Sequence, residues 1–241
     1  MRRPPLRSVL RFLVLLSVTA LILPWILVLP LTVFQPPTTT IILARTAQRL
    51  FAGKRPAYPH RNTVARNEIS PQLRRAVLAF EDDRFYLHNG FDFEEIENAL
   101  ERSRRGRRLR GASTITQQTA KNLFLWEGRS FVRKGVEAYV ALILEVVLSK
   151  DRILDLYLNL AEWGDGAFGA EAGARMHFKK GAARLTRDEA TRLAAILPAP
   201  RRWSPHGTIA RRRAAIIAPR MYYAAPREAP DAPAASRSRR R

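Results

Sequence analysis

The chain has 241 residues, no cysteine and a formal net charge of +21 at pH 7. This length can build one good-sized hydrophobic core but not two large domains, and the lack of cysteine excludes disulfide bonds and thiolate metal sites. The excess of positive charge indicates an anionic partner, and nucleic acid, an anionic membrane surface and a phosphorylated substrate all meet that description.

A run of 23 uncharged residues, 12–34, follows a short basic N-terminus of residues 1–11. About 20 apolar residues in a helix cross the hydrocarbon core of a bilayer, so the run predicts a single transmembrane anchor. Four arginines before it predict a cytoplasmic N-terminus and an exported remainder. An exported domain does not meet the chromosome, which argues against nucleic acid as the partner. The alternative is a signal peptide cleaved after Ala20, but the apolar run continues for 14 more residues, which favours the anchor.

Residues 35–67 contain several threonines and prolines and few periodic apolar positions, which predicts a stalk. The folded domain is expected over residues 68–225. Its first helix should begin with Ser70 as the N-cap and Pro71 in the first turn, and should end at Glu81.

Further helices are expected in chain order, one of them opened by a capping box of Asp92 and Glu95. Apolar spacing predicts the others at residues 114–125, 131–148, 153–160, 187–197 (capped by Thr186 with Glu189) and 209–222. The six arginines within residues 102–110 are interpreted as a solvated loop. Because no segment alternates as a half-buried strand does, the fold class is predicted to be mainly α. Residues 226–241 are too poor in apolar side chains to pack and predict a disordered basic tail.

Four segments carry most of the candidate chemistry. They are EDDRFYLHNG (Glu81–Gly90), RGASTITQQTAKNL (Arg110–Leu123), GRSFVRKGVE (Gly128–Glu137) and RILDLYLNLAEWGDGAFGAEA (Arg152–Ala172). In order and spacing these segments resemble the peptidoglycan glycosyltransferases, glycosyltransferase family 51, over residues 68–221. Since the sequence contains no penicillin-binding domain, it is most similar to the monofunctional biosynthetic members.

The resemblance implies a lysozyme-like helical domain on one transmembrane helix, facing the periplasm from the inner (cytoplasmic) membrane. It also implies polymerisation of lipid II into β-1,4-linked glycan strands with release of undecaprenyl pyrophosphate. The partners expected from it are lipid II, the growing glycan strand, membrane lipids and proteins of cell-wall synthesis or division, with no nucleic acid.

Glu81 is the candidate catalytic base. Glycosyl transfer to a hydroxyl needs a carboxylate that takes the proton and cations that stabilise a departing pyrophosphate. Partial burial and the neighbouring Asp82 and Asp83 would raise the pKa of Glu81 towards neutrality. On local sequence alone a solvated acid at a helix end is the alternative. By resemblance, Glu81 deprotonates the 4-hydroxyl of the acceptor sugar, which attacks C1 of the donor with inversion.

Positive charge near the second and third segments comes from Lys121, Arg129, Arg133 and Lys134. Arginine suits bidentate phosphate contacts and lysine acts as a point charge. By resemblance, Lys121 and Arg129 bind the donor pyrophosphate; a solvated basic face is the alternative. Glu137 interrupts an apolar helix, where it can pair with Arg133 four residues earlier. By resemblance it is the second active-site glutamate.

A polar block precedes and enters the helix predicted at residues 114–125. Helix N-termini attract anions and glutamine amides can bind sugar hydroxyls, so the block is a candidate substrate site, with simple helix capping as the alternative. Its candidate residues are Ser113, Thr114, Gln117 and Gln118.

Other residues of the four segments are expected to support the site without reacting: Asp82, Phe85, His88, Gly90, Gly111 and Asn159. No spacing predicts a metal site built from protein ligands. By family analogy, a magnesium or manganese ion could bridge the substrate pyrophosphate. Two residues depart from the family pattern: Val136 stands where many relatives carry lysine, and His177 where tyrosine is usual.

Two other functions remain open on the sequence. A lytic transglycosylase or muramidase also uses a glutamate on a lysozyme-like fold, but it needs neither the pyrophosphate-binding cations nor the polar block. A non-catalytic basic protein anchored in the membrane would give no particular role to Glu81 or Glu137.

Overall fold

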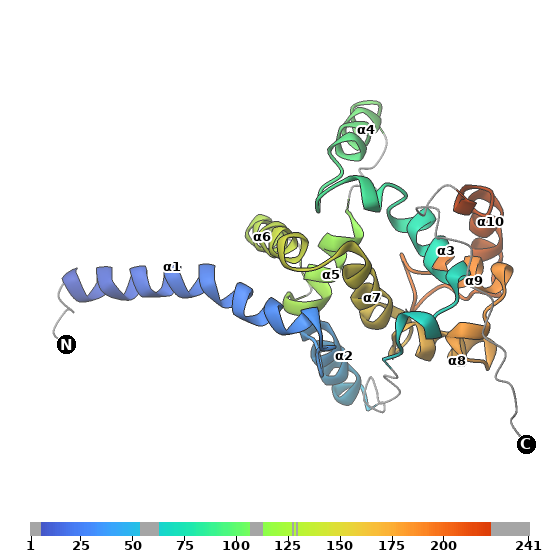
Figure 1. Cartoon of the computed structure of the whole chain (residues 1–241), viewed down its shortest axis with the longest axis horizontal. Coiled ribbons are helices and arrows are strands. Elements are labelled where there is room, and N and C mark those ends of the chain that lie inside the picture. Colours follow the sequence, from blue (N-terminus) through green and yellow to red (C-terminus); the bar gives the residue numbers. More distant parts are fainter. Residues whose placement is uncertain (1–5, 54–62, 107–112, 127, 129, 223–241) are drawn as a thin grey trace, which may run out of the picture.

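The computed structural model describes residues 6–53, 63–106, 113–126, 128 and 130–222. Figure 1 shows the first helix, α1 (Leu6–Val28), running away from a body of helices that contains all later elements. The 3-10 turn η1 (Leu29–Thr32) continues α1. Among the described residues, Arg7–Thr32 is the one helical stretch long and apolar enough to cross a membrane, with a mean hydropathy of 2.7.

Helix α1 is hydrogen-bonded to the later helices. Trp25 Nε1 donates to the hydroxyl of Tyr139 on α6 (Phe131–Val147) at 3.0 Å, and that hydroxyl donates to the carbonyl of Leu21 at 2.6 Å. Beyond α1, Arg152 donates to the carbonyls of Leu31 at 2.7 Å and Phe34 at 2.8 Å. Both ends of this junction are therefore held by side chains of the domain.

The segment predicted as a stalk, residues 35–67, contains a helix, α2 (Thr40–Phe51). The Thr39 hydroxyl accepts from the N–H of Ile42 and caps it. Thr40 Oγ1 donates to the carbonyls of Leu123 and Leu125, which attaches α2 to the end of α5 (Ile115–Phe124). Tertiary contacts of this kind leave little trace in the local apolar spacing. Residues 54–62 lie outside the described residues.

The hydrophobic core is formed by two groups of helices. α3 (Pro71–Glu81) packs on α9 (Arg187–Ala195), which packs on α10 (Thr208–Ile217). α5 packs on α6 and on α7 (Lys150–Leu160). Buried alanines such as Ala76 on α3 and Ala190 on α9 let the helices approach closely. α4 (Phe93–Arg104) projects from this body in Figure 1.

The remaining elements are short. An antiparallel hairpin, β1 (Glu162–Gly164) and β2 (Ala167–Phe168), leads into α8 (Ala170–Phe178). Four further 3-10 turns are η2 (Arg66–Glu68), η3 (Phe85–Leu87), η4 (Ala182–Arg184) and η5 (Arg220–Tyr222). The hairpin and α8 were not predicted, and the mainly α fold class is confirmed.

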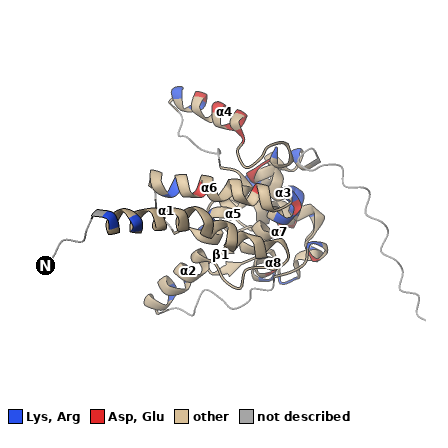
Figure 2. Cartoon of the chain, turned by 60° about the vertical axis from the view of Figure 1, so that its left-hand side comes forward, with Lys and Arg blue, Asp and Glu red and all other residues tan. Residues whose placement is uncertain are grey.

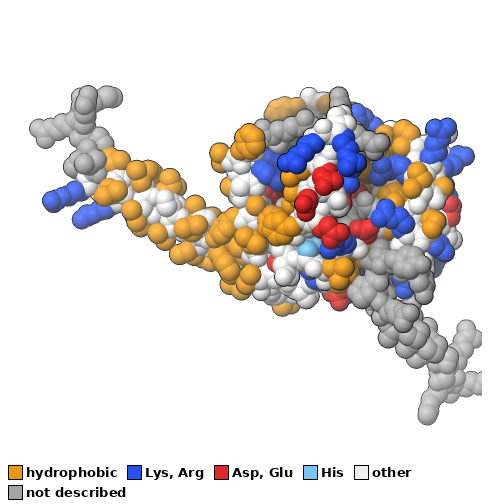
Figure 3. Space-filling view, turned by 90° about the horizontal axis from the view of Figure 1, so that it is seen from above, with side chains coloured by type: hydrophobic (Ala, Val, Ile, Leu, Met, Phe, Trp, Pro, Cys, Tyr) orange, Lys and Arg blue, Asp and Glu red, His pale blue; other side chains and the backbone are white. Residues whose placement is uncertain are grey.

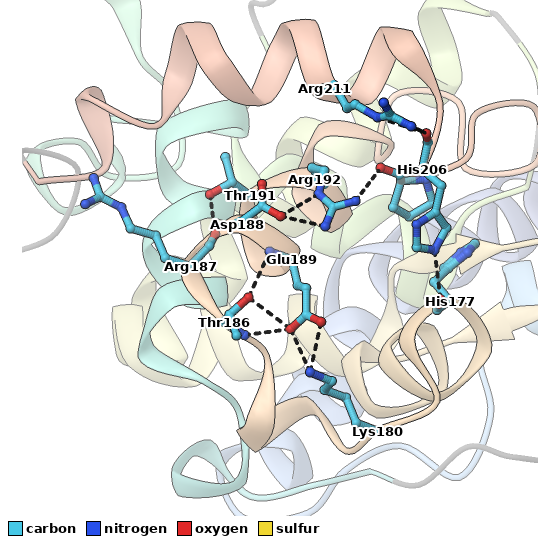
Figure 4. A network of polar contacts seen from close by, with 11 residues as sticks. His177, Lys180, Thr186, Arg187, Asp188, Glu189, Thr191, Arg192, His206 and Arg211 are labelled. Atoms are coloured by element: carbon cyan, nitrogen blue, oxygen red, sulfur yellow. Dashed lines mark hydrogen bonds and ion pairs between the residues drawn. The ribbon is translucent and has the colours of Figure 1, made fainter.

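The capping box predicted for α9 is present, and two other helix ends differ from the prediction for local reasons. Thr186 and Glu189 form the predicted capping box of α9, drawn in Figure 4. α9 ends at Ala195, before the predicted Leu197, since the residue before Pro198 disfavours the helical region. α7 begins three residues before the predicted start because the Ser149 hydroxyl caps it.

Two further predictions about helix ends were wrong. Ser70 occupies the N-cap position of α3, but its hydroxyl donates to the carbonyl of Leu185 at 3.0 Å and makes no capping bond. The helix predicted over residues 209–222 is divided into α10 and η5, because Pro219 has no N–H to continue the helical ladder.

Candidate active site

Glu81 is the last residue of α3 and is partly buried. Gln118 Nε2, from α5, donates to Glu81 Oε2 at 2.9 Å. Burial raises the pKa of the Glu81 carboxyl above its ordinary value, while the Gln118 hydrogen bond and the charges of Arg213 and Lys121 act in the opposite direction. A carboxylate with a raised pKa is suited to general-base catalysis near neutral pH.

Asp82 connects the first segment to the second. Its Oδ2 accepts from the backbone N–H of Ile115, the first residue of α5, at 2.9 Å, and its Oδ1 accepts from His88 Nε2 at 2.9 Å. The Thr114 hydroxyl adds a bond to the carbonyl of Gly90 at 2.7 Å. Asp82 and His88 therefore support the site by holding two segments together.

Phe85 and Gly90 have packing roles in the same segment. The Phe85 ring is fully buried, and the ammonium group of Lys150 lies 4.5 Å from its centroid. Gly90 has a φ of +84°, and a Cβ there would lie 3.2 Å from Cγ of Glu145. Any larger residue at position 90 would be strained and would crowd α6.

The polar block divides into capping and site residues. Thr114 and Gln117 form a capping box, in which Gln117 Oε1 accepts from the Thr114 N–H at 3.2 Å. Gln117 is buried and turned towards the backbone, whereas Gln118 turns towards Glu81. Ser113 is exposed and borders a cavity next to Glu81.

The predicted cations lie on two neighbouring helices. Lys121 is one turn beyond Gln118 on α5, and burial lowers the pKa of its ammonium group. On α6, Arg133 Nη1 donates to Glu137 Oε2 at 2.8 Å, and Lys134 contacts the other oxygen of Glu137. In Figure 2 the ribbon of α6 carries the colours of both acidic and basic residues. Arg129 and Gly111 lie outside the described residues.

Glu137 is almost completely buried, with its side chain 5% exposed. Its charge is matched by Arg133 and Lys134, as helical spacing allows. The Nε atom of Arg133 is buried and has no hydrogen-bond partner among the described residues. The guanidinium therefore retains a donor that an anionic ligand could use.

The Glu81–Gln118 hydrogen bond joins two residues that border different cavities. The larger, about 550 Å³, is bordered by Gln118, Lys121 and Tyr157. The smaller, about 320 Å³, is bordered by Glu81, Ser113 and other residues of the first segment. The carboxylate of Glu81 therefore borders the smaller cavity, and its hydrogen-bond partner Gln118 borders the larger one.

The fourth segment borders the larger cavity, through Tyr157 among others, and also makes structural contacts. Asn159 accepts from the N–H of Val64 at 3.0 Å and donates to the carbonyl of the same residue at 3.1 Å. Of the two departures from the family pattern, Val136 is partly exposed on α6. His177 Nε2 donates to the carbonyl of Trp163 at 2.7 Å, and its own carbonyl accepts from His206, as drawn in Figure 4.

Two residues near Glu81 had no distinguishing signal in the sequence. The Tyr157 hydroxyl lies 3.2 Å from Gln118 Oε1. The guanidinium of Arg213 lies 5.4 Å from the ring centroids of both Phe80 and Trp203, and its Nε donates to the carbonyl of Ala195. Tyr157 is one of several large residues on a core helix, and Arg213 is the last of three consecutive arginines.

Within the described part of the chain, one group of acidic and histidine side chains could hold a cation. The candidate ligand atoms of Asp82, His88 and Asp92 lie within 4.8 Å of one another. Asp82 already accepts from Ile115, and Asp92 caps α4 by accepting from the N–H of Glu95. These bonds account for the cluster as a structural feature.

Comparison with known proteins identifies the family. Residues 48–222 match the family model described as Transglycosylase. A biosynthetic peptidoglycan transglycosylase of Xanthomonas campestris pv. campestris (strain B100) is 46% identical over 192 residues, which cover 79% of this chain and 78% of the relative. A protein of the same name from Pseudomonas fluorescens (strain SBW25) is 48% identical over 194 residues, covering 79% and 80%. The match confirms the family inferred from the four segments: this chain belongs to the transglycosylase family.

Proposed function

We propose that the chain is a peptidoglycan glycosyltransferase of cell-wall synthesis that polymerises lipid II into β-1,4-linked glycan and releases undecaprenyl pyrophosphate. The names of its relatives support this activity. The observation that carries the proposal is the hydrogen bond between Glu81 and Gln118, because Glu81 borders one cavity and Gln118 borders the other.

In the proposed reaction, the acceptor sugar occupies the smaller cavity. Glu81 takes the proton of its 4-hydroxyl, and the oxygen attacks C1 of the donor in the larger cavity. The bond between C1 and the pyrophosphate oxygen breaks with inversion, and the pyrophosphate leaves with the electron pair.

The leaving group is assigned to Lys121 and Arg133. Lys121 borders the larger cavity, and the charge of Arg133 acts on Lys121. Cations placed where negative charge develops stabilise the transition state. Glu137 holds Arg133 and Lys134 in place through its two oxygens. Arg129, which the resemblance also assigns to the pyrophosphate, remains part of the proposal without structural support.

A magnesium or manganese ion is proposed to bind through the pyrophosphate oxygens rather than through a protein-built site. The acids nearest the cations, Glu81 and Glu137, already accept hydrogen bonds from protein side chains. Such an ion would add positive charge to the leaving group. The test is to remove free divalent ions from the purified protein and measure its use of the donor, which should fall.

The proposed location is the inner membrane, with one span and the domain in the periplasm. In Figure 2 the start of the α1 ribbon is coloured for basic residues, which favour a cytoplasmic N-terminus. Figure 3 shows hydrophobic side chains along α1 that continue onto the domain where the two meet. The α6 residues Val132 and Val146 are also exposed, and the hydrophobic surface where α1 meets the domain would lie near the lipid that carries the substrate. Cell-wall synthesis or division proteins are proposed partners.

The experiment is incubation of the purified full chain with labelled lipid II, followed by sizing of the products. Long glycan from the native protein and none from Glu81→Gln support the proposal. Digestion of preformed glycan with lipid II left intact would identify a lytic enzyme instead. Inactivity on both substrates would favour a non-catalytic anchor protein.

A further inference from the structure

We propose that Tyr157 is a positioning residue for Glu81: its hydroxyl sets the orientation of the Gln118 amide, so that the Gln118 NH₂ group is directed at the Glu81 carboxylate. The inference rests on the proposed function, in which Glu81 is the base. It concerns a residue of the buried helix α7 that makes no direct contact with Glu81 among the described hydrogen bonds.

The three side chains form a linear chain of hydrogen bonds from three helices. Tyr157 on α7 lies 3.2 Å from Gln118 Oε1 on α5, and Gln118 Nε2 lies 2.9 Å from Glu81 Oε2 at the end of α3. Tyr157 is 1% exposed, so packing restricts the position of its ring. One rigid side chain thus controls the partner of a catalytic carboxylate.

The direction of the chain follows from donor and acceptor chemistry. A glutamine amide has one accepting end and one donating end. When the Tyr157 hydroxyl donates to Oε1, the NH₂ end must face Glu81, where it stabilises the charged carboxylate. Burial raises the pKa of the Tyr157 hydroxyl well above its ordinary value, with Glu81 and Asp82 adding to the effect. Tyr157 therefore keeps its proton throughout the working range of pH.

Other groups also act on Glu81 and must be separated from this effect. The charged and titratable ones are Asp82 beside it, Lys121 on α5, Arg213 on α10 and Tyr157 itself. Replacing Tyr157 by phenylalanine changes none of the charges. It removes one hydroxyl and nearly no volume, so the charge effects stay constant in the comparison.

The test is the pH dependence of polymerisation by full-length Tyr157→Phe with lipid II. Without the hydroxyl the amide loses its preferred orientation, and the carboxylate loses part of its stabilisation. The acid limb of kcat should move to higher pH by about half to one unit. KM for lipid II should stay within about twofold, and activity should recover towards the native level as pH rises.

Tyr86→Phe is the matched control, because it removes a hydroxyl that bonds to Asp151 at 2.9 Å, away from Glu81. It should keep the native acid limb. Gln118→Met is the second variant; it removes both bonds of the chain and should move the limb at least as far as Tyr157→Phe. Thermal unfolding shows whether each variant is folded. If Tyr157→Phe does not fold, the acid limb of Gln118→Met tests the inference in its place.

A native acid limb in both Tyr157→Phe and Gln118→Met would overturn the inference. A uniform loss of activity at every pH with an unchanged limb would do so as well, because it would give Tyr157 a purely structural role. The proposed function fails separately, if native protein makes no glycan or if Glu81→Gln makes it at the native rate.

Discussion

The carboxylate of Asp82 accepts a hydrogen bond from the backbone N–H of Ile115, 33 residues later in the chain, at 2.9 Å. The bond joins the residue after the proposed base to the N-terminus of α5, and α5 carries Gln118 and Lys121. A negative charge at a helix N-terminus is stabilising. The distance between the base and the proposed donor site therefore depends on Asp82.

Replacement of Asp82 by asparagine should destabilise the domain. The variant keeps one acceptor oxygen but loses the charge and one of two hydrogen bonds, a cost of roughly 1–3 kcal/mol. The unfolding midpoint should fall by at least about 2 °C. Asp83→Asn is the control, since Asp83 forms an exposed ion pair with Arg220. Equal midpoints for the two variants would contradict the role given to Asp82.

Replacement of Glu81 by glutamine should reduce glycan synthesis by about 10²–10⁴-fold, the usual contribution of a general base. Lipid II binding should persist, because Lys121 and Arg133 are unchanged. Product sizing and a lipid II binding assay check the two effects.

The same variant should be more stable than the native protein at neutral pH. Burial raises the pKa of folded Glu81 above its unfolded value, so its contribution to stability is fully present below the unfolded pKa. That contribution is lost as pH rises through the folded pKa. Glutamine does not ionise, so the gain in unfolding free energy should be small near pH 4 and should grow towards neutrality. Thermal unfolding of both proteins between pH 4 and neutrality measures this difference in unfolding free energy. A difference that stays constant across the range would argue against a raised pKa of Glu81.

Lys121→Met and Arg133→Met should impair use of the donor. Each removes one charged donor of hydrogen bonds from the leaving pyrophosphate, and such bonds contribute roughly 1.5–3 kcal/mol. A loss of about tenfold to a hundredfold in kcat/KM is expected in steady-state assays. Arg105→Ala serves as the control, because its pair with Glu101 on α4 is solvent-exposed. If the control lost as much activity as Lys121→Met, the pyrophosphate site would lie elsewhere.

Arg213→Gln should move the acid limb of activity to higher pH. The positive charge of Arg213 lowers the pKa of Glu81. Activity requires the Glu81 carboxylate, so without this charge a higher pH is needed to ionise Glu81. A movement of about half to one pH unit is expected for the loss of one nearby charge. Arg213→Lys keeps the charge and should move the limb less. The reverse order of the two variants would exclude the electrostatic role.

Local signals predicted much of the helical framework. Thr186, Thr114 and Asp92 cap helices with their own side chains, so sequence neighbours alone decide those starts. Ser70 has the same local pattern, yet its hydroxyl bonds to Leu185, 115 residues away. A distant acceptor of this kind has no local signature.

The site was predictable to a similar extent. The four segments pointed to Glu81, Gln118 and Lys121, and the structure brings these side chains together. The different roles of the neighbouring residues Gln117 and Gln118 could not be predicted. Gln117 and Gln118 are adjacent and identical in chemistry, but helix geometry turns one towards the backbone and the other towards Glu81.

The junction between α1 and the domain has a mechanical consequence. Tyr139 holds the helix at Leu21 and Trp25, and Arg152 holds the chain just beyond it. A membrane helix adapts to a thicker or thinner bilayer by changing its tilt. With α1 in a bilayer, the domain held to it by these bonds would follow a change in tilt. The thickness of the bilayer would then set the angle at which the Glu81 site meets the lipid surface.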